Sequence, residues 1–357
     1  MKKINICFYS RSMATKVFSF IGKRLEDLDI QTCYIIHNQK DEDRLEQDGC
    51  KNKIYNLTEY IEKNWNNDAL LSSVDLEMIE KKYEIESLWS IFYTDRFLIY
   101  YTYEEAIKFI KLHISFYLDI IEKEAIDFFV YENISHFSAY IFFIIGKFHN
   151  VRYLGFSEPR NFSDKKFHFT NDENSTNYKL NQYYEESDFL DQELVETREF
   201  IKNYRIHKSR PKYMDVYGKE PKLNYKILKG ILKYPQYLFN KKNFFDYMRY
   251  KDKDANPLRS FKSYLKYNIH KLYYHESNEK DTFYFFPLHF QPEATTLVNA
   301  QNYEKQLNAI DLLAKKIPIG TKLYVKEHYA DLGHRELDFY SKLKIYPNVR
   351  LIDPWEN

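Results

Sequence analysis

Glycine is scarce in this chain, with 8 copies in 357 residues. The loop after the first apolar run, Ser10-Arg11-Ser12, contains none, which excludes the glycine-rich fingerprint of dinucleotide-binding proteins at this position. Tyrosine and phenylalanine are abundant, with 34 and 28 copies. Together with the many lysines, asparagines and isoleucines, they indicate an AT-rich coding bias rather than a function.

Cysteine is also rare. The three copies, Cys7, Cys33 and Cys50, are an odd number with no Cys-x-x-Cys spacing, which argues against a disulfide framework. Cys7 and Cys33 lie within apolar runs. We therefore expect buried thiols in a reducing compartment.

The chain has no apolar run of the roughly 20 residues that a membrane-spanning helix needs. The longest candidate, Ala139 to Ile145, is interrupted by Gly146 and Lys147. The basic start of the chain is followed by a short apolar run, which predicts a first strand rather than a signal peptide. These features predict a cytoplasmic protein, and the length of the chain is sufficient for two domains with sizeable cores.

Charge is segregated along the chain. Residues 202–271 contain 19 Lys and Arg but 5 Asp and Glu, although the whole chain carries a net charge of +1. Aromatic residues are interleaved with these bases, a mixture that suits an anionic membrane surface, where each base contributes about 1 kcal/mol. Nucleic acid is the rival partner for such a patch, and a solvated, lysine-rich helical insertion is the third interpretation.

The amino-terminal residues predict a β-α-β unit: a strand at Lys3–Tyr9, a helix at Thr15–Leu28 and a strand at Ile30–Ile36. Such a crossover is right-handed and makes a parallel sheet. The helix start could face an anion, because free backbone N–H groups and Arg11 gather there. A simple helix cap by Ser12 is the alternative that we favour.

Helices are predicted within residues 59–123, with an apolar stripe along Glu104–Glu124. Strands follow at Ile126–Tyr131 and Val151–Phe156, and polar residues follow each of them. The pattern fits a first Rossmann-like domain that ends near residue 180. The polar residues at its strand ends are Arg11, Glu132 with His136, and Glu158 with Arg160.

These strand ends supply candidate site residues in the first domain. Glu132 could act as a general base that deprotonates an attacking sugar hydroxyl, with His136 beside it. Arg11 and Arg160 are candidates for binding an acceptor or an anion. The argument for these roles is spacing alone.

The last part of the chain, residues 281–357, predicts alternating strands and helices. Polar triplets follow the first two strands: Gln291-Pro292-Glu293 and Lys326-Glu327-His328. Because open parallel sheets bind ligands outside the carboxyl ends of their strands, both triplets are expected at a binding edge. Lys326 and His328 could hold a phosphate through charge-assisted hydrogen bonds, and Glu293 could orient a sugar hydroxyl or simply begin a helix.

At this point the sequence resembles the capsule polysaccharide biosynthesis proteins, a family that includes the Kdo transferases. The resemblance rests on the aromatic strand before His289, the Gln291-Pro292-Glu293 triplet, Gln306, Pro318 with Gly320, and Lys326-Glu327-His328. It covers about the last fifth of the chain, and Tyr329 stands where the family usually has Pro. The resemblance implies a GT-B glycosyltransferase in which Gln291, Glu293, Lys326 and His328 bind the nucleotide-sugar donor, with CMP-Kdo as the leading candidate.

The family continues beyond the point where this sequence stops, with a Gly- and Ser-rich segment that completes the nucleotide pocket. We therefore expect a fragment or a shortened relative whose second sheet exposes apolar surface, because a parallel sheet needs both faces buried.

The eleven histidines are scattered, and there is no Asp-x-Asp motif. No metal or other cofactor is expected; cationic side chains and helix N-termini would neutralise the leaving phosphate instead.

The sequence thus predicts an α/β protein with two Rossmann-like domains of GT-B type, the second apparently incomplete. We expect an acceptor domain at 1–180, a helical basic and aromatic insertion at 181–278, and the start of a nucleotide-sugar domain at 279–357. The predicted activity is glycosyl transfer to a glycan or glycolipid acceptor, with residues 202–271 at the inner face of the plasma membrane and no nucleic acid partner. The alternatives are a nucleotide-sugar epimerase of the same double-Rossmann shape, and a non-catalytic truncated paralogue that binds membrane or a partner.

Overall fold

The computed structural model describes most of the chain: residues 3–50, 53–157, 167–188, 191–207, 220–223, 225–232, 235, 244–246 and 257–356. Glu158, Arg160 and much of the basic 202–271 segment lie outside them, so the predictions made for these residues stay predictions. The chain divides into two compact units, which are described separately. The first unit comprises 1–179, 242–252 and 297–299, and the second comprises 180–241, 253–296 and 300–357.

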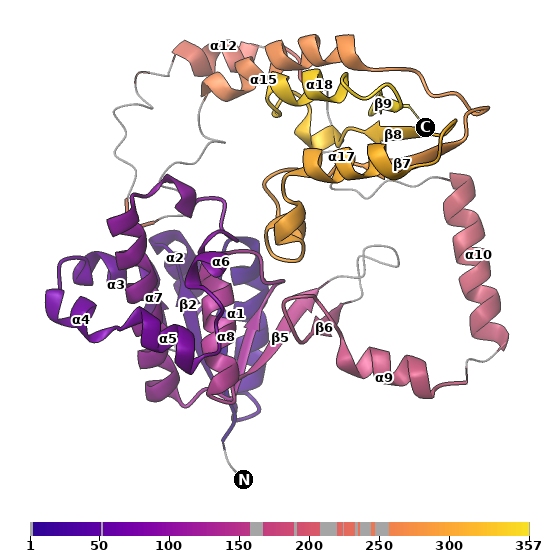
Figure 1. The fold of residues 1–357 in the computed structure, drawn as a ribbon. Helices are drawn as coiled ribbons and strands as arrows, with labels where there is room; N and C mark the ends of the chain where they lie inside the picture. The colour runs from indigo at the N-terminus through magenta and orange to yellow at the C-terminus, as the bar shows by residue number, and fades with distance from the viewer. Residues whose placement is uncertain are drawn as a thin grey trace. The chain divides into compact units, whose positions relative to one another are not determined.

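The first unit contains a six-stranded sheet with the strand order β3-β2-β1-β4-β5-β6 (Figure 1). Its strands are β1 (Asn5–Tyr9), β2 (Gln31–Ile36), β3 (Lys53–Asn56), β4 (Phe128–Tyr131), β5 (Arg152–Ser157) and β6 (His168–Thr170). The first five are parallel and β6 is antiparallel to β5. The order 3-2-1-4-5 reverses direction between β1 and β4, and doubly wound sheets bind ligands beside such a reversal.

Helices cover both faces of this sheet. They are α1 (Met13–Glu26), α2 (Gln39–Gln47), α3 (Leu57–Asn64), α4 (Asp68–Ser73), α5 (Leu76–Lys82), α6 (Leu88–Phe92), the short 3-10 helix η1 (Leu98–Tyr100), α7 (Tyr103–Glu124) and α8 (Phe137–Phe148). Because side chains alternate along a strand, Cys7 and Tyr9 of β1 face the core under α7 and α8. Phe8, between them, packs with Phe18 of α1 on the other face.

Several sequence predictions are confirmed in this unit, and some are not. The parallel β-α-β start is observed, and all three cysteines are buried free thiols. The 59–123 region is helical, as predicted: several short helices precede the 22-residue α7, and Asn67, Asp75 and Ser87 each cap a new helix start. Strands β3 and β6 were missed, since runs of four and three residues carry little periodic signal.

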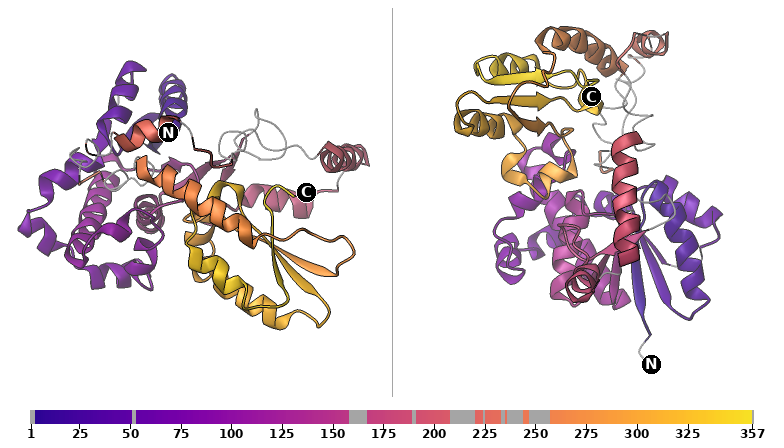
Figure 2. Two further views of the ribbon diagram at one scale, coloured as in Figure 1. Left: turned by 90° about the horizontal axis from the view of Figure 1, so that it is seen from above. Right: turned by 90° about the vertical axis from the view of Figure 1, so that its right-hand side faces the viewer.

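The second unit contains a three-stranded parallel sheet, drawn in orange and yellow in Figure 2. Its strand order is β7-β8-β9. Its strands are β7 (Phe283–Pro287), β8 (Lys322–Lys326) and β9 (Val349–Ile352). Leu323, Val325 and Leu351 pack with Ile310 and Tyr340 in one core cluster. Side chains of β7 are less covered: Phe283, Tyr284 and Phe285 are 45%, 53% and 55% exposed. The predicted exposure of apolar surface is confirmed for this strand.

The remaining described helices are α9 (Tyr178–Glu186), α10 (Asp191–His207), α12 (Tyr225–Leu232), α15 (Pro257–His270), η3 (Lys271–Tyr273), α16 (Ala294–Leu297), η4 (Gln301–Tyr303), α17 (Gln306–Lys316), η5 (Tyr329–Asp331) and α18 (Leu337–Leu343). α9 begins at the division between the two units. None of the helices in the described part of the chain combines the length and apolarity that crossing a bilayer requires.

Candidate functional site

Each unit gathers polar side chains beyond the carboxyl ends of its parallel strands. In the first unit they follow β1, β2 and β4, and in the second they follow β7 and β8. The two groups differ in chemistry, because the first is a network of buried histidines and tyrosines and the second is built on ion pairs.

In the first unit, the hydroxyl groups of two core tyrosines meet at one serine. Tyr9 lies at the end of β1; its hydroxyl contacts Nε2 of His37 and donates to Oγ of Ser138 at 2.8 Å. The hydroxyl of Tyr117 shares the same Oγ. Burial lowers the pKa of His37 well below its usual value, and the charge of Arg11 lowers it further. His37 is therefore neutral at pH 7, and the network carries hydrogen bonds rather than charge.

His136 lies at the amino end of α8, where it acts as a helix cap. Its Nδ1 accepts from the backbone N–H of Ala139 at 3.4 Å, and its Nε2 lies 2.9 Å from the hydroxyl of Tyr131. Asp95 also caps the start of α8, because its Oδ2 accepts from the backbone N–H of Phe137 at 3.2 Å. His136 is 4% exposed and burial lowers its pKa well below the usual value. Both ring nitrogens thus serve the fold, so Glu132 is the better candidate for proton transfer.

Glu132 follows β4 directly and its side chain reaches the surface. Protein atoms around its carboxylate raise its pKa, while the charge of Arg11 lowers it. A raised pKa suits a general base that works near neutral pH. Burial raises the pKa of the Tyr131 hydroxyl, and Arg11 opposes this rise through its charge and a hydrogen bond. The structure therefore brings three predicted residues together, Arg11, Glu132 and His136, whereas Arg160 lies outside the described residues.

The start of α1 differs from the sequence prediction. Ser12 occupies the cap position, but its side chain makes no capping bond and its φ is +52°. The carboxylate of Asp41 accepts from the backbone N–H of Ser12 at 2.9 Å and from the hydroxyl of Thr15 at 3.3 Å. Asp41 is 3% exposed. The prediction that Ser12 caps this helix was wrong, because a buried carboxylate from α2 supplies the negative charge that the helix start attracts.

In the second unit, Glu327 is the centre of an ion-pair network. Its Oε1 accepts from Nε of Arg335 at 3.0 Å and its Oε2 accepts from the hydroxyl of Tyr340 at 2.6 Å. Arg335 also pairs with Asp331 at 2.9 Å and donates to the backbone oxygen of His289 at 2.6 Å. The Arg335 side chain is 8% exposed. One guanidinium therefore ties the loop after β7 to the loop after β8.

The two carboxylates respond differently to this cation. Burial raises the pKa of Asp331 to about 7, although the charge of Arg335 opposes the rise and the charge of Glu327 adds to it. Burial also tends to lower the pKa of Arg335, but the two carboxylates outweigh it and the net shift is upward. Arg335 is thus a permanent cation, and Asp331 changes its charge near neutral pH.

His328 follows Glu327 and points its ring to the start of η5. Its Nδ1 accepts from the backbone N–H of Ala330 at 3.2 Å. This contact assigns the proton of the neutral ring to Nε2, which is then a donor. Burial lowers the pKa of His328, while the charges of Glu293 and Glu327 oppose the change. The ring stacks on Tyr329 with centroids 4.7 Å apart, so it is held in one orientation.

The other predicted donor-binding residues lie at the same two loops. Glu293 Oε2 accepts from the hydroxyl of Thr295 at 3.1 Å, and Gln291 lies in the loop after β7. Nζ of Lys326 donates to the backbone oxygen of Glu356, and its predicted role beside His328 in holding a phosphate stays a prediction. Side chains alternate along β8, so Lys326 and Glu327 leave the strand on opposite faces.

Sequence reasoning missed Arg335, Asp331 and Tyr340 in this unit, and Tyr9, His37 and Asp95 in the first. In the second unit, the sequence signal for these residues was the spacing of Glu327, Asp331 and Arg335, which are four residues apart.

Gln306 was noted only through the resemblance. Its side chain accepts from the N–H of His289 at 2.7 Å and donates to the backbone oxygen of His289 at 3.0 Å. Among the described residues, no three His, Cys, Asp or Glu side chains are grouped as a metal site.

Comparison with known proteins assigns no family to this chain. No family model and no curated protein matches it. Two solved structures are similar to it at a low level. One is a provisionally described UDP-N-acetylglucosamine 2-epimerase from Listeria monocytogenes, with 8% identity, a TM-score of 0.26, and coverage of 100% of this chain and 70% of that one. The other is the UDP-GlcNAc 2-epimerase from Neisseria meningitidis bound to UDP-GlcNAc, with 11% identity, a TM-score of 0.24, and coverage of 99% and 73%. Scores this low carry no conclusion about activity.

Proposed function

We propose that this protein is a metal-independent glycosyltransferase of GT-B type that uses a nucleotide-activated sugar in bacterial surface polysaccharide assembly. The second unit would bind the donor, with CMP-Kdo as the leading candidate, and the first would bind a glycan or glycolipid acceptor. Support comes from two α/β units, each with polar side chains beyond the carboxyl ends of parallel strands, where such sheets bind their ligands.

The single observation that carries the proposal is the hydrogen-bonding state of His328. Its Nδ1 is occupied by Ala330, so Nε2 presents a proton at the end of β8. Arg335 stays paired with its two carboxylates and ties the loop of His289 to the loop of Glu327, so the position of this donor is fixed. A preorganised hydrogen-bond donor of this kind stabilises charge that develops on a leaving phosphate.

The protonation of Asp331 adds to this account. With Asp331 ionised, the cluster of Glu327, Asp331 and Arg335 carries one net negative charge, which would repel a phosphate. With Asp331 protonated, the cluster is neutral. Because the pKa of Asp331 lies at about 7, a bound phosphate would favour proton uptake at this carboxyl, and nucleotide binding would strengthen as the pH falls through 7.

The donor site is tested by titrating CMP and UDP into the wild type and three variants by calorimetry. His328→Ala should weaken binding by about 1.5–3 kcal/mol, the range for a hydrogen bond to a charged group. His328→Asn keeps an acceptor at the position of Nδ1 but lacks Nε2, so it should fold normally and bind equally weakly. His275→Ala, an exposed histidine of the same unit, is the matched control. Unchanged affinity in the folded His328→Asn protein would refute the assignment.

The acceptor side is tested separately. Glu132→Gln should leave CMP and UDP affinity unchanged and reduce nucleotide release from CMP-Kdo in the presence of a bacterial glycolipid extract by 10²-fold or more, the usual contribution of a general base. If UDP-GlcNAc were instead converted to another sugar nucleotide without any acceptor, the epimerase alternative would replace the transferase.

A further inference from the structure

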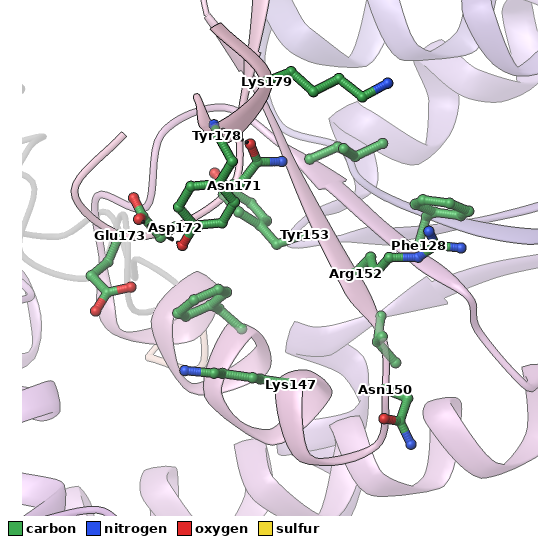
Figure 3. Close-up of a pocket in the computed structure, with 13 residues that line it drawn as sticks. Phe128, Lys147, Asn150, Arg152, Tyr153, Asn171, Asp172, Glu173, Tyr178 and Lys179 are labelled. Carbon is green, nitrogen blue, oxygen red and sulfur yellow. Dashed lines mark hydrogen bonds between the residues drawn. The ribbon is translucent and has the colours of Figure 1, made fainter. Parts of the chain in front are cut away.

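The first unit has a cavity of about 940 Å³ that the proposed transfer site does not use. It lies beside the starts of β4 and β5, because its lining includes their first residues, Phe128 and Arg152. The last turn of α8 and the loop before α9 form its other walls (Figure 3). Glu132 follows the opposite end of β4, so the cavity is separate from the candidate base.

The cavity lies along a part of strand β5 that β6 does not pair with. β6 pairs with Gly155, Phe156 and Ser157 of β5, and its register ends where Thr170 meets Gly155. The first half of β5, Arg152–Leu154, has no neighbouring strand on that side within the described residues. All three of these residues line the cavity. An edge of three residues is too short to hold an added peptide strand, whose affinity comes from a row of main-chain hydrogen bonds.

One wall is a fixed aromatic side chain. The hydroxyl of Tyr178 donates to Asp172 at 3.0 Å, and its backbone N–H donates to the side chain of Asn171 at 3.1 Å. Asp172 is held in turn by the backbone N–H groups of Asn174 and Thr176, at 3.0 and 2.8 Å. Tyr178 nevertheless remains 57% exposed. An exposed aromatic ring that is held in one place by its hydrogen bonds is a preorganised binding surface.

The charges at the cavity are also available to a ligand. Lys147 and Lys179 line it, and both side chains are exposed. Arg152 places its guanidinium over the ring of Phe128, 4.4 Å from the centroid. The carboxylate of Asp172 is already used by its own turn. Glu173 is the other carboxylate at the rim, so positive charge is in excess.

We propose that this cavity binds an acidic saccharide through its carboxylate groups and sugar rings. The two lysines supply charge-assisted hydrogen bonds to carboxylates. Tyr178 supplies a flat apolar surface for the C–H face of a sugar ring, and the side-chain amide of Asn150 at the lining suits a hydroxyl group. A mostly apolar lining with a few converging polar groups is typical of small-ligand sites.

The test measures binding of trigalacturonic acid by calorimetry, with maltotriose as an uncharged trisaccharide, inorganic phosphate as an anion without a sugar, and a hexaglutamate peptide as an acidic chain. The variants are Lys147→Gln/Lys179→Gln and Tyr178→Ala. The matched control is Lys40→Gln/Lys63→Gln, which removes two exposed lysines of the same unit. We expect trigalacturonic acid to bind more tightly than the other three probes by at least tenfold. The first double variant and Tyr178→Ala should each weaken it at least tenfold, and the control double variant less than twofold.

Several results would overturn the proposal: no binding of trigalacturonic acid at millimolar concentration, equal binding of any of the other three probes, or equal weakening in the control double variant. Affinity for CMP and UDP should be the same in the wild type and in Lys147→Gln/Lys179→Gln. This readout separates the cavity from the proposed transfer site, because either can fail without the other.

Discussion

Glu327 offers the sharpest test of how the second unit is built. Its side chain is 0% exposed and accepts three hydrogen bonds, from Nε of Arg335 at 3.0 Å, the hydroxyl of Tyr340 at 2.6 Å and the backbone N–H of His328 at 2.9 Å. Glu327→Gln keeps the shape of the side chain but removes its charge. The buried guanidinium of Arg335 would then keep one ion-pair partner from this network, Asp331. It would also face an amide in place of one carboxylate.

The expected cost follows from the burial of this pair. Breaking a buried ion pair by removing one partner costs about 3–5 kcal/mol, because the remaining charge is left uncompensated. Asp331 still neutralises part of the Arg335 charge, and the glutamine oxygen still accepts one hydrogen bond. We therefore expect the lower end of the range, about 3 kcal/mol.

Hydrogen exchange monitored on peptides measures this cost within the unit that contains the residue. Amides of β8 in Glu327→Gln should exchange roughly a hundredfold faster than in the wild type, since 1.36 kcal/mol corresponds to a factor of ten, while amides of β4 in the first unit serve as an internal reference. Glu279→Gln, an exposed carboxylate of the same unit, is the matched control. Less than a threefold change in β8, or the same change in the control, would show that the network contributes little to stability.

Two further predictions concern pH and helix capping. The pKa of Asp331 is raised to about 7 by burial, so the folded state binds this proton more tightly than the unfolded state, and its contribution to stability declines as the pH rises from about 4 to 7. Urea denaturation measures the free energy of unfolding of the wild type and of Asp331→Asn at pH 5 and at pH 8. From pH 5 to pH 8, the value for the wild type should fall by on the order of 2 kcal/mol more than the value for the variant. If the difference between the two proteins is the same at both pH values, the pKa of Asp331 is not shifted. In the first unit, the hydroxyl of Thr102 accepts from the N–H of Glu105 and the carboxylate of Glu105 accepts from the N–H of Thr102, so Thr102→Ala should cost about 1 kcal/mol in urea denaturation. Thr102→Ser keeps the capping oxygen and should cost little; equal losses in the two variants would argue against the capping box.

Much of the architecture could be predicted from the chain because it depends on local patterns. The apolar run at Lys3–Tyr9 and the apolar stripe along Glu104–Glu124 each predict their element, and a β-α-β order predicts parallel pairing. The carboxyl ends of the strands could be read as candidate binding edges for the same reason. The capsule-family resemblance and the assigned donor roles stay predictions.

Short elements and long-range partners could not be read in this way. Strand β6 depends on its pairing with Gly155, Phe156 and Ser157 and not on its own three residues. The roles of His136 and Lys326 depended on where each side chain points, which residue types alone do not state. His136 became a buried cap because α8 begins there, and the ammonium group of Lys326 donates to the backbone oxygen of Glu356, 30 residues further along the chain.

The sequence by itself determined the β-α-β start of the chain, the burial of its cysteines, and the loops that carry charge, since each follows from periodicity and composition within a few residues. Only the tertiary structure decided which charges meet. Asp41 neutralises the start of α1 across 29 residues, and Arg335 ties the loop of His289 to that of Glu327 across 46. Such pairs arise because burying a charge is costly unless a partner of opposite charge is brought to it, and the partner is selected by packing rather than by position in the chain.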